Sequence, residues 1–118
     1  MESKTAKWLT DILEAIQEIN DFVQKNQIRS FPNYQQNKML KRAVERNLEI
    51  IGEAVNRIKQ NDEQTLLKIE HARSIIALRN HVIHAYDSIS DENIWSILIK
   101  HLPKLKVEVK NLLENRPK

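Results

Sequence analysis

The sequence predicts an all-α fold, a four- to five-helix up-and-down bundle, from three observations. Residues that interrupt helices are scarce, with one glycine and three prolines in 118 residues. Apolar residues recur at spacings of three and four, which is the period of an amphipathic helix. Leucine, glutamate, lysine and glutamine, which favour helices, are common. The length fits a single domain over residues 1–118, large enough to bury a core.

Two helices are expected in the first half of the chain. The first covers residues 5–25, and its apolar stripe begins at Trp8 and ends at Phe22 or Val23. A polar connection follows over residues 26–33, where Pro32 disfavours a helical Phe31. The second helix is predicted from residue 33 or 34 to residue 59, with an apolar face wide enough for packing on two sides. We interpret Gly52, in its middle, as the mark of a close helix crossing.

Two more helices are expected in the second half, after a loop or short helical turn over residues 60–68. One covers residues 69–86. The other begins after Ser90, a good N-cap followed by two acidic residues in the first turn, and ends near residue 114. Pro103 is expected to kink or restart this last helix because proline lacks a backbone N–H. Its predicted buried side consists of Ile94, Trp95, Leu98, Ile99, Leu102, Leu105, Val109, Leu112 and Leu113. Trp8 and Trp95 are expected to be core or interface anchors.

Composition excludes several classes of protein. The chain has no cysteine and no apolar run long enough to span a membrane. No apolar signal-peptide core is present near the N-terminus, so we expect a cytoplasmic protein. The net charge of +3 permits contact with RNA but does not demand it. A small basic cluster is better interpreted as a solvated helix face: Lys38, Lys41, Arg42 and Arg46. Phe, Trp and Tyr make up only 5% of the residues, too few for a base-stacking platform, so any RNA contact should be local and electrostatic.

The most informative motif has the pattern R-x4-H-x-Y and lies near the end of the third predicted helix: Arg79, Asn80, His84 and Tyr86. Asn80 and His84 are four residues apart and share a helix face. Arg79 and His84 are about 140° apart around a helix, so they could flank a groove but could not lie over one another. Two copies of this helix facing each other in a symmetric dimer would bring the groups together more fully.

These side chains suit metal-independent cleavage of RNA. Arginine stabilises the negative charge of a phosphoryl transition state, and histidine exchanges protons near neutral pH. The bland alternative is a surface Arg79, a His84 that complements the helix dipole, and a Tyr86 that only packs. His71, His81 and His101 are expected to be structural or surface groups. The spacing of His81 and His84 could hold a metal, but no third ligand is evident, so no metal or other cofactor is expected.

Three segments together resemble the HEPN superfamily, specifically its HepT-like branch. The motif segment, residues 79–86, resembles that branch's signature. A second-helix run over residues 43–54, ending in Ile51-Gly52-Glu53-Ala54, is similar to its characteristic sequence. The residues around Trp95 and Pro103 also match. The resemblance covers nearly the whole chain in the same order and is far more specific than the motif alone.

The resemblance implies a homodimer with a composite cleft, acting as a ribonuclease toxin of a toxin–antitoxin pair. It implies a nucleotidyltransferase antitoxin of the MNT type, which can transfer AMP to the motif tyrosine. Carried over to this chain, Arg79 and His84 are catalytic, Asn80 is supporting, and Tyr86 is the AMPylation site. Glu53 lies in a matching segment without a role that we can assign.

The chain departs from the branch's pattern at two places. Ala85 stands where the motif usually has glycine, and Glu70-His71-Ala72 replace a proline and an aromatic residue. These departures leave the candidate catalytic groups intact. A second function also fits the sequence, a non-catalytic helical module that binds nucleotide or RNA beside a nucleotidyltransferase. The presence of His84 favours the enzyme, since an anion-binding module needs the arginine but has little need of the histidine.

Overall fold

The computed structural model describes residues 3–84 and 90–115, with only the backbone described for residues 79–84. This part of the chain is helical and contains no strand, so the predicted all-α bundle is confirmed. The helices are α1 (Ser3–Lys25), α2 (Phe31–Gln36), α3 (Lys38–Asn61), α4 (Glu63–Leu66), α5 (Ala72–His84), α6 (Asp91–Ser96), the π-helical turn η1 (Ile97–His101) and α7 (Leu102–Glu114).

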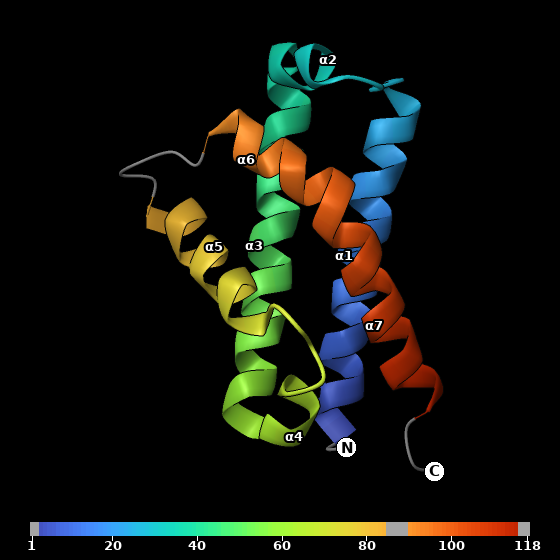
Figure 1. The fold of residues 1–118 in the computed structure, drawn as a ribbon, viewed down its shortest axis with the longest axis vertical. Helices are drawn as coiled ribbons and strands as arrows, with labels where there is room; N and C mark the ends of the chain where they lie inside the picture. Colours follow the sequence, from blue (N-terminus) through green and yellow to red (C-terminus); the bar gives the residue numbers. More distant parts are fainter. Residues whose placement is uncertain (1–2, 85–89, 116–118) are drawn as a thin grey trace.

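Helix α3 is the centre of the bundle. It lies between α1 on one side and α5 on the other, and α7 packs against α1 (Figure 1). The short helices close the two ends, with α2 beside the start of α3 and α4 directly after its end. This agrees with the wide apolar face predicted for this helix, and buried Gly52 lies in its middle.

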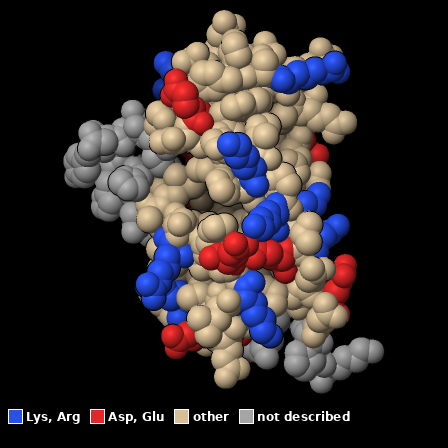
Figure 2. All heavy atoms as spheres, viewed as in Figure 1, with Lys and Arg blue, Asp and Glu red and all other residues tan. Residues whose placement is uncertain are grey.

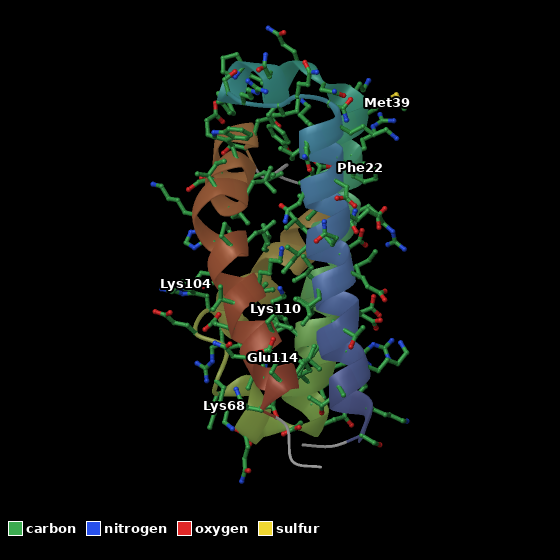
Figure 3. The ribbon with its side chains drawn as sticks, turned by 90° about the vertical axis from the view of Figure 1, so that its right-hand side faces the viewer. Phe22, Met39, Lys68, Lys104, Lys110 and Glu114 are labelled. Carbon is green, nitrogen blue, oxygen red and sulfur yellow. The ribbon has the colours of Figure 1, made fainter. Side chains whose placement is uncertain are left out.

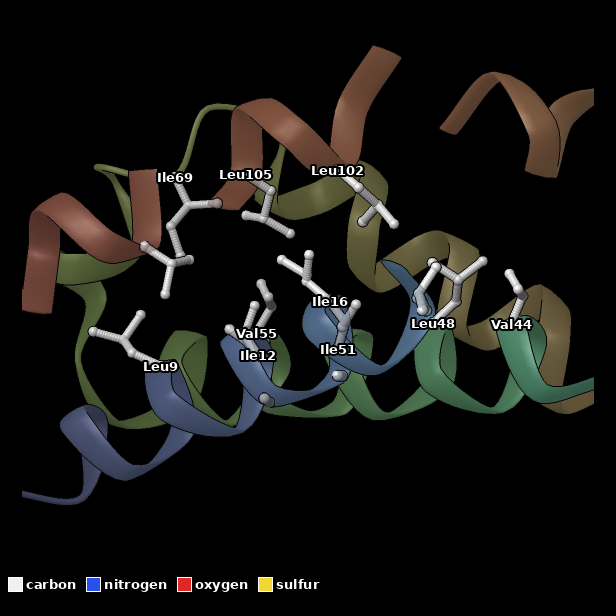
Figure 4. Packing of buried hydrophobic residues seen from close by; sticks show 14 of the residues in the cluster. Leu9, Ile12, Ile16, Val44, Leu48, Ile51, Val55, Ile69, Leu102 and Leu105 are labelled. Atoms are coloured by element: carbon white, nitrogen blue, oxygen red, sulfur yellow. The ribbon is translucent and has the colours of Figure 1, made fainter. Parts of the chain in front are cut away.

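The core is formed where α1, α3 and α7 meet. Leu102 and Leu105 of α7 point toward Ile16 of α1, and the side chains of α3 complete the layer (Figure 4). These positions are at most 4% exposed, as the apolar stripes predicted. Trp8 is also buried, which confirms its predicted place in the core.

The predicted second helix was wrong at its start. The chain forms the separate helix α2 and breaks at Asn37 before α3 begins. Residues 31–33 are therefore helical rather than part of a loop, because proline is tolerated in the first turn of a helix, where its missing N–H would have no partner. The Ser30 side chain caps this turn by accepting from the backbone N–H of Asn33.

The second half follows the prediction more closely. A short helix, α4, lies within residues 60–68, and the Ser90 hydroxyl accepts from the backbone N–H of Asn93 at 3.2 Å, as expected for an N-cap. Helix α5 begins at Ala72 rather than residue 69, although Ile69 is buried in the preceding turn. The predicted end of this helix, at residue 86, lies outside the described residues.

The last helix is interrupted just before Pro103, as predicted. The interruption is the π-helical turn η1, in which the backbone N–H of Leu102 reaches the carbonyl of Ile97 five residues earlier. One expectation fails in this turn, since Ile99 is 56% exposed rather than buried. The wider turn changes which side of the helix faces the core.

Candidate functional site

Three of the four motif residues predicted from the sequence lie on α5. The helical backbone extends through Arg79, Asn80 and His84, which confirms that these three positions are helical. Their side-chain geometry and the whole of Tyr86 lie outside the described residues. Their assignment as catalytic, supporting and modified residues therefore stays a prediction.

Helix α5 packs one of its sides against α3. Ala72 is buried, and Ile75, Ile76 and Leu78 pack partly buried against the core. Arg73 and Ala77 of the same helix are exposed.

The helical backbone fixes how the motif positions are distributed around α5. Positions 79 and 84 lie about 140° apart around the helix axis. Positions 80 and 84 lie about 40° apart. The motif therefore spans two sides of one helix, as its spacing predicted.

The chain after the motif is anchored at the start of α6. The Lys41 ammonium of α3 binds the Asp91 carboxylate at 3.1 Å, and both side chains are about three-quarters buried. The Trp95 ring lies 5.7 Å from that of Tyr34 and 6.5 Å from that of Phe31, measured between centroids. Helix α6 is thus fastened to α2 and α3, and Trp95 is an interface anchor as predicted.

Charge around this anchor is partly buried. The Glu45 carboxyl has a raised pKa, first because of burial and then because of the nearby Asp91 carboxylate. In the basic cluster, Lys38, Arg42 and Arg46 are exposed while Lys41 pairs with Asp91. The cluster is thus mainly a solvated face of α3, as the sequence indicated.

A cleft opens between α5 and the α6–η1–α7 helix, and we call it the α5–α7 cleft. Its volume is about 630 Å³, and Figure 2 shows a hollow on this face with basic and acidic side chains near its edge. Leu48 and Ile51 of α3 are among the residues that line it. The other lining residues are His71, Ser74, Ile75, Ala77, Leu78, Asn93, Ile97, His101, Leu102, Lys104, Leu105 and Glu108.

Two histidines meet beside this cleft. The rings of His71 and His101 lie 5.7 Å apart between centroids and are inclined at 76°, edge to face. Both residues are exposed, so the prediction that they are surface groups is confirmed. Their pairing was missed, because they are 30 positions apart and no spacing within one helix connects them.

Ionic contacts hold the edge of the cleft together. The Lys104 ammonium binds the Glu70 carboxylate at 2.9 Å, and the Glu108 carboxylate accepts from the backbone N–H of Glu70 at 3.0 Å. Lys104 lowers the pKa of the Glu70 carboxyl through this hydrogen bond and its charge. In the side view of Figure 3, Lys104 extends from α7 away from α1. The chain before α5 is thereby tied to α7.

Two features are absent from the described part of the chain. Residues 3–84 and 90–115 contain no group of three or more His, Cys, Asp or Glu side chains placed to hold a metal ion. None of the helices described is both long and apolar enough to cross a bilayer.

The described part of the chain is an all-α bundle, and the comparisons with known proteins give its class, a family of ribonucleases. The family described as "Ribonuclease HepT-like" matches residues 12–112, and the chain belongs to this family. No solved structure matches the chain.

Two relatives cover most of the chain. "Putative RNase MJ1380" of Methanocaldococcus jannaschii is 37% identical over 102 residues, which are 86% of this chain and 90% of that protein. "Probable ribonuclease HepT" of Thermococcus cleftensis is 32% identical over 112 residues, 95% of this chain and 98% of that protein. The resemblance to the HepT-like branch is thereby confirmed, and a ribonuclease acting on RNA is the function that the family supports.

Proposed function

We propose that this protein is a metal-independent endoribonuclease toxin of a toxin–antitoxin system, a single HepT-like domain over residues 1–118. The observation that carries the proposal is the match to a ribonuclease family over residues 12–112, a range that contains the sequence motif of Arg79, Asn80, His84 and Tyr86. In this proposal, Arg79 and His84 are catalytic and Asn80 supports them. RNA is cleaved in the cytoplasm, where such a toxin meets its substrate.

The proposed reaction uses the ribose 2′-hydroxyl as nucleophile. A histidine takes the proton of this hydroxyl as its oxygen attacks the neighbouring phosphorus, and the bond from phosphorus to the 5′-oxygen breaks. The leaving oxygen receives a proton, giving a 2′,3′-cyclic phosphate and a 5′-hydroxyl. Arg79 stabilises the charge that develops on the phosphoryl oxygens. Asn80 orients the imidazole or the phosphate by hydrogen bonding.

A homodimer completes the proposed site. The backbone register of α5 puts position 79 and positions 80 and 84 on different sides of the helix. Two α5 helices facing each other would supply an arginine from one copy and a histidine from the other across one cleft. Two histidines related by symmetry could then divide the roles of base and acid.

A nucleotidyltransferase antitoxin is the proposed regulator. The Tyr86 hydroxyl would attack the α-phosphorus of ATP bound to that partner, forming a tyrosyl–AMP bond and releasing pyrophosphate. The added phosphate would occupy the anion site beside Arg79 and exclude RNA. The proton of the Tyr86 hydroxyl is lost to solvent when the tyrosyl–AMP bond forms.

The decisive experiment is RNA cleavage by partner-free protein in EDTA. Wild type is compared with Arg79→Ala, His84→Ala and the matched control Arg73→Ala, an exposed arginine about 1.7 turns before Arg79 on α5. We expect the two motif variants to lose roughly 100-fold or more in rate, the usual contribution of a positioned acid–base group. The Arg73 variant should keep wild-type activity, and circular dichroism should show all four proteins folded.

The same experiment can reject the enzyme. Absence of cleavage by folded wild type, with mass spectrometry showing Tyr86 unmodified, would contradict the catalytic role. The protein would then be assigned to the alternative, a non-catalytic module that binds nucleotide or RNA beside its nucleotidyltransferase.

A further inference from the structure

The α5–α7 cleft borders the proposed catalytic motif. Leu78 lines the cleft and directly precedes Arg79, and Ile75 lies about one helical turn earlier. The distance along α5 from Leu78 to His84 is about 9 Å at the rise of a regular helix. A single RNA strand could therefore reach from the cleft to the motif positions on α5.

The size of the cleft fits one flat organic group with its sugar. Its volume of about 630 Å³ lies within the range of small-molecule pockets, roughly 300–1,000 Å³. Aliphatic side chains form its interior, including Leu48 and Ile51 from α3 and Leu102 from α7. Such walls favour an apolar, planar body over a hydrated one.

The charged groups at the cleft favour a neutral occupant. Lys104 is already paired with Glu70, and the Glu108 carboxylate would repel a phosphate. Asn93 and Ser74 provide uncharged hydrogen-bonding groups among the lining residues. These features suit the polar edge of a nucleobase better than the RNA backbone.

The cleft contains stacking surfaces, although the low content of Phe, Trp and Tyr predicted no base-stacking platform. His71 and His101 contribute two imidazole rings that already meet edge to face. Histidine is one of the side chains on which unpaired RNA bases stack. The two rings therefore offer a stacking surface to a base in the cleft.

We infer that the α5–α7 cleft binds an unpaired nucleobase of the RNA substrate close to the cleaved phosphodiester. The inference rests on the proposed nuclease function and adds a substrate class to it, single-stranded RNA with a free base at this position. A fully paired duplex would not fit, because its bases are stacked within the helix.

The test is a binding measurement with short single-stranded RNAs in which one nucleotide at a time lacks its base. The protein carries His84→Ala so that the RNA stays intact, and affinity is measured by fluorescence anisotropy. We expect one abasic position to weaken binding roughly 5- to 150-fold, the effect of losing one stacked base. The other positions should change affinity little.

Substitutions in the cleft test whether the loss of affinity at the abasic position arises there. Ala77→Phe fills the cleft from an exposed position on α5, and Gln17→Phe is the matched control on the exposed side of α1. Ala77→Phe should weaken binding of intact RNA, and the abasic position should no longer lower the affinity further. Gln17→Phe should keep the wild-type affinity and the wild-type loss at the abasic position. His101→Ala is a second, less bulky variant and should reduce that loss.

The possible failures are distinguishable. The cleft inference would be overturned if the abasic position weakened binding to Ala77→Phe as much as to the protein without this substitution. It would also be overturned if every abasic position had the same effect. Neither result would contradict RNA cleavage in EDTA. A change in subunit number of Ala77→Phe, measured by light scattering, would overturn it too, because the cleft would be covered by a second copy. Base-dependent binding without cleavage by wild type would instead retain the cleft and reject the nuclease.

Discussion

The hydroxyl of Tyr34 is a buried polar atom inside an otherwise apolar contact. Its residue is 0% exposed, and the oxygen has no hydrogen-bond partner among the residues that the structure describes. Burial raises the pKa of the phenol, and the carboxylates of Glu45 and Asp91 raise it further, so the group stays neutral at physiological pH. The ring, rather than the hydroxyl, therefore fastens α2 to Trp95.

Replacing this hydroxyl should stabilise the protein. We expect Tyr34→Phe to raise the free energy of unfolding by about 1 kcal/mol, because a buried donor without a partner is removed and the ring is kept. Urea denaturation measures the change. Tyr34→Ala is the control and should cost about 3–5 kcal/mol through the cavity it leaves. A loss of stability in Tyr34→Phe would show that the hydroxyl has a partner.

At the residue scale, the sequence predicted contacts within one helix better than contacts between helices. Trp8 and Trp95 were correctly assigned as anchors because large aromatic residues on an apolar stripe are usually buried. The neighbourhood of His71 and His101 depends on how the turn before α5 lies against η1, and apolar periodicity does not encode that arrangement. The candidate motif was read directly from the sequence, yet how its side chains converge stays a prediction.

Asn37 ends one helix and begins the next. Its backbone N–H donates to the carbonyl of Tyr34 at 3.2 Å, and its side-chain oxygen accepts from the backbone N–H of Leu40 at 3.0 Å. The sequence predicted one continuous helix because asparagine occurs both inside helices and at their ends. The competing hydrogen bond from the asparagine side chain is the physical reason for the break.

Loss of this cap should weaken the start of α3. We expect Asn37→Ala to lower the free energy of unfolding by about 1 kcal/mol, since the N–H of Leu40 loses its acceptor. Asn37→Asp keeps an acceptor oxygen and should stay close to wild type. Chemical denaturation followed by circular dichroism provides the comparison. Equal stability of the alanine and aspartate variants would contradict the capping role.

A carboxylate closes one end of the whole bundle. The Asp62 side chain accepts from the hydroxyls of Thr5 and Thr65, each at 2.9 Å, and from the backbone N–H of Thr65 at 3.2 Å. Thr5 lies in α1, while Asp62 joins the end of α3 to α4. Near the opposite end, which α2 covers in Figure 1, Lys41 pairs with Asp91 and joins α3 to α6.

Removal of this carboxylate should affect the whole molecule. We expect Asp62→Ala to lower the free energy of unfolding by about 3 kcal/mol, because two buried hydroxyl donors and a helix cap lose their acceptor. Asp62→Asn keeps one oxygen acceptor and should lose less. Unfolding in urea, followed at several wavelengths, tests both variants. A loss below about 1 kcal/mol in Asp62→Ala would mean that these contacts are replaced by water.

The π-helical turn η1 has a consequence for how relatives of this chain align. A turn closed over five residues contains one residue more than a regular α-helical turn, so α6 and α7 follow two different registers. A relative without this residue would rotate its last helix by about 100° relative to α6. Leu105 and Val109 would then leave the core, unless neighbouring positions exchanged apolar for polar side chains. A one-residue gap here should therefore be accompanied by a shift of the whole apolar pattern that follows it.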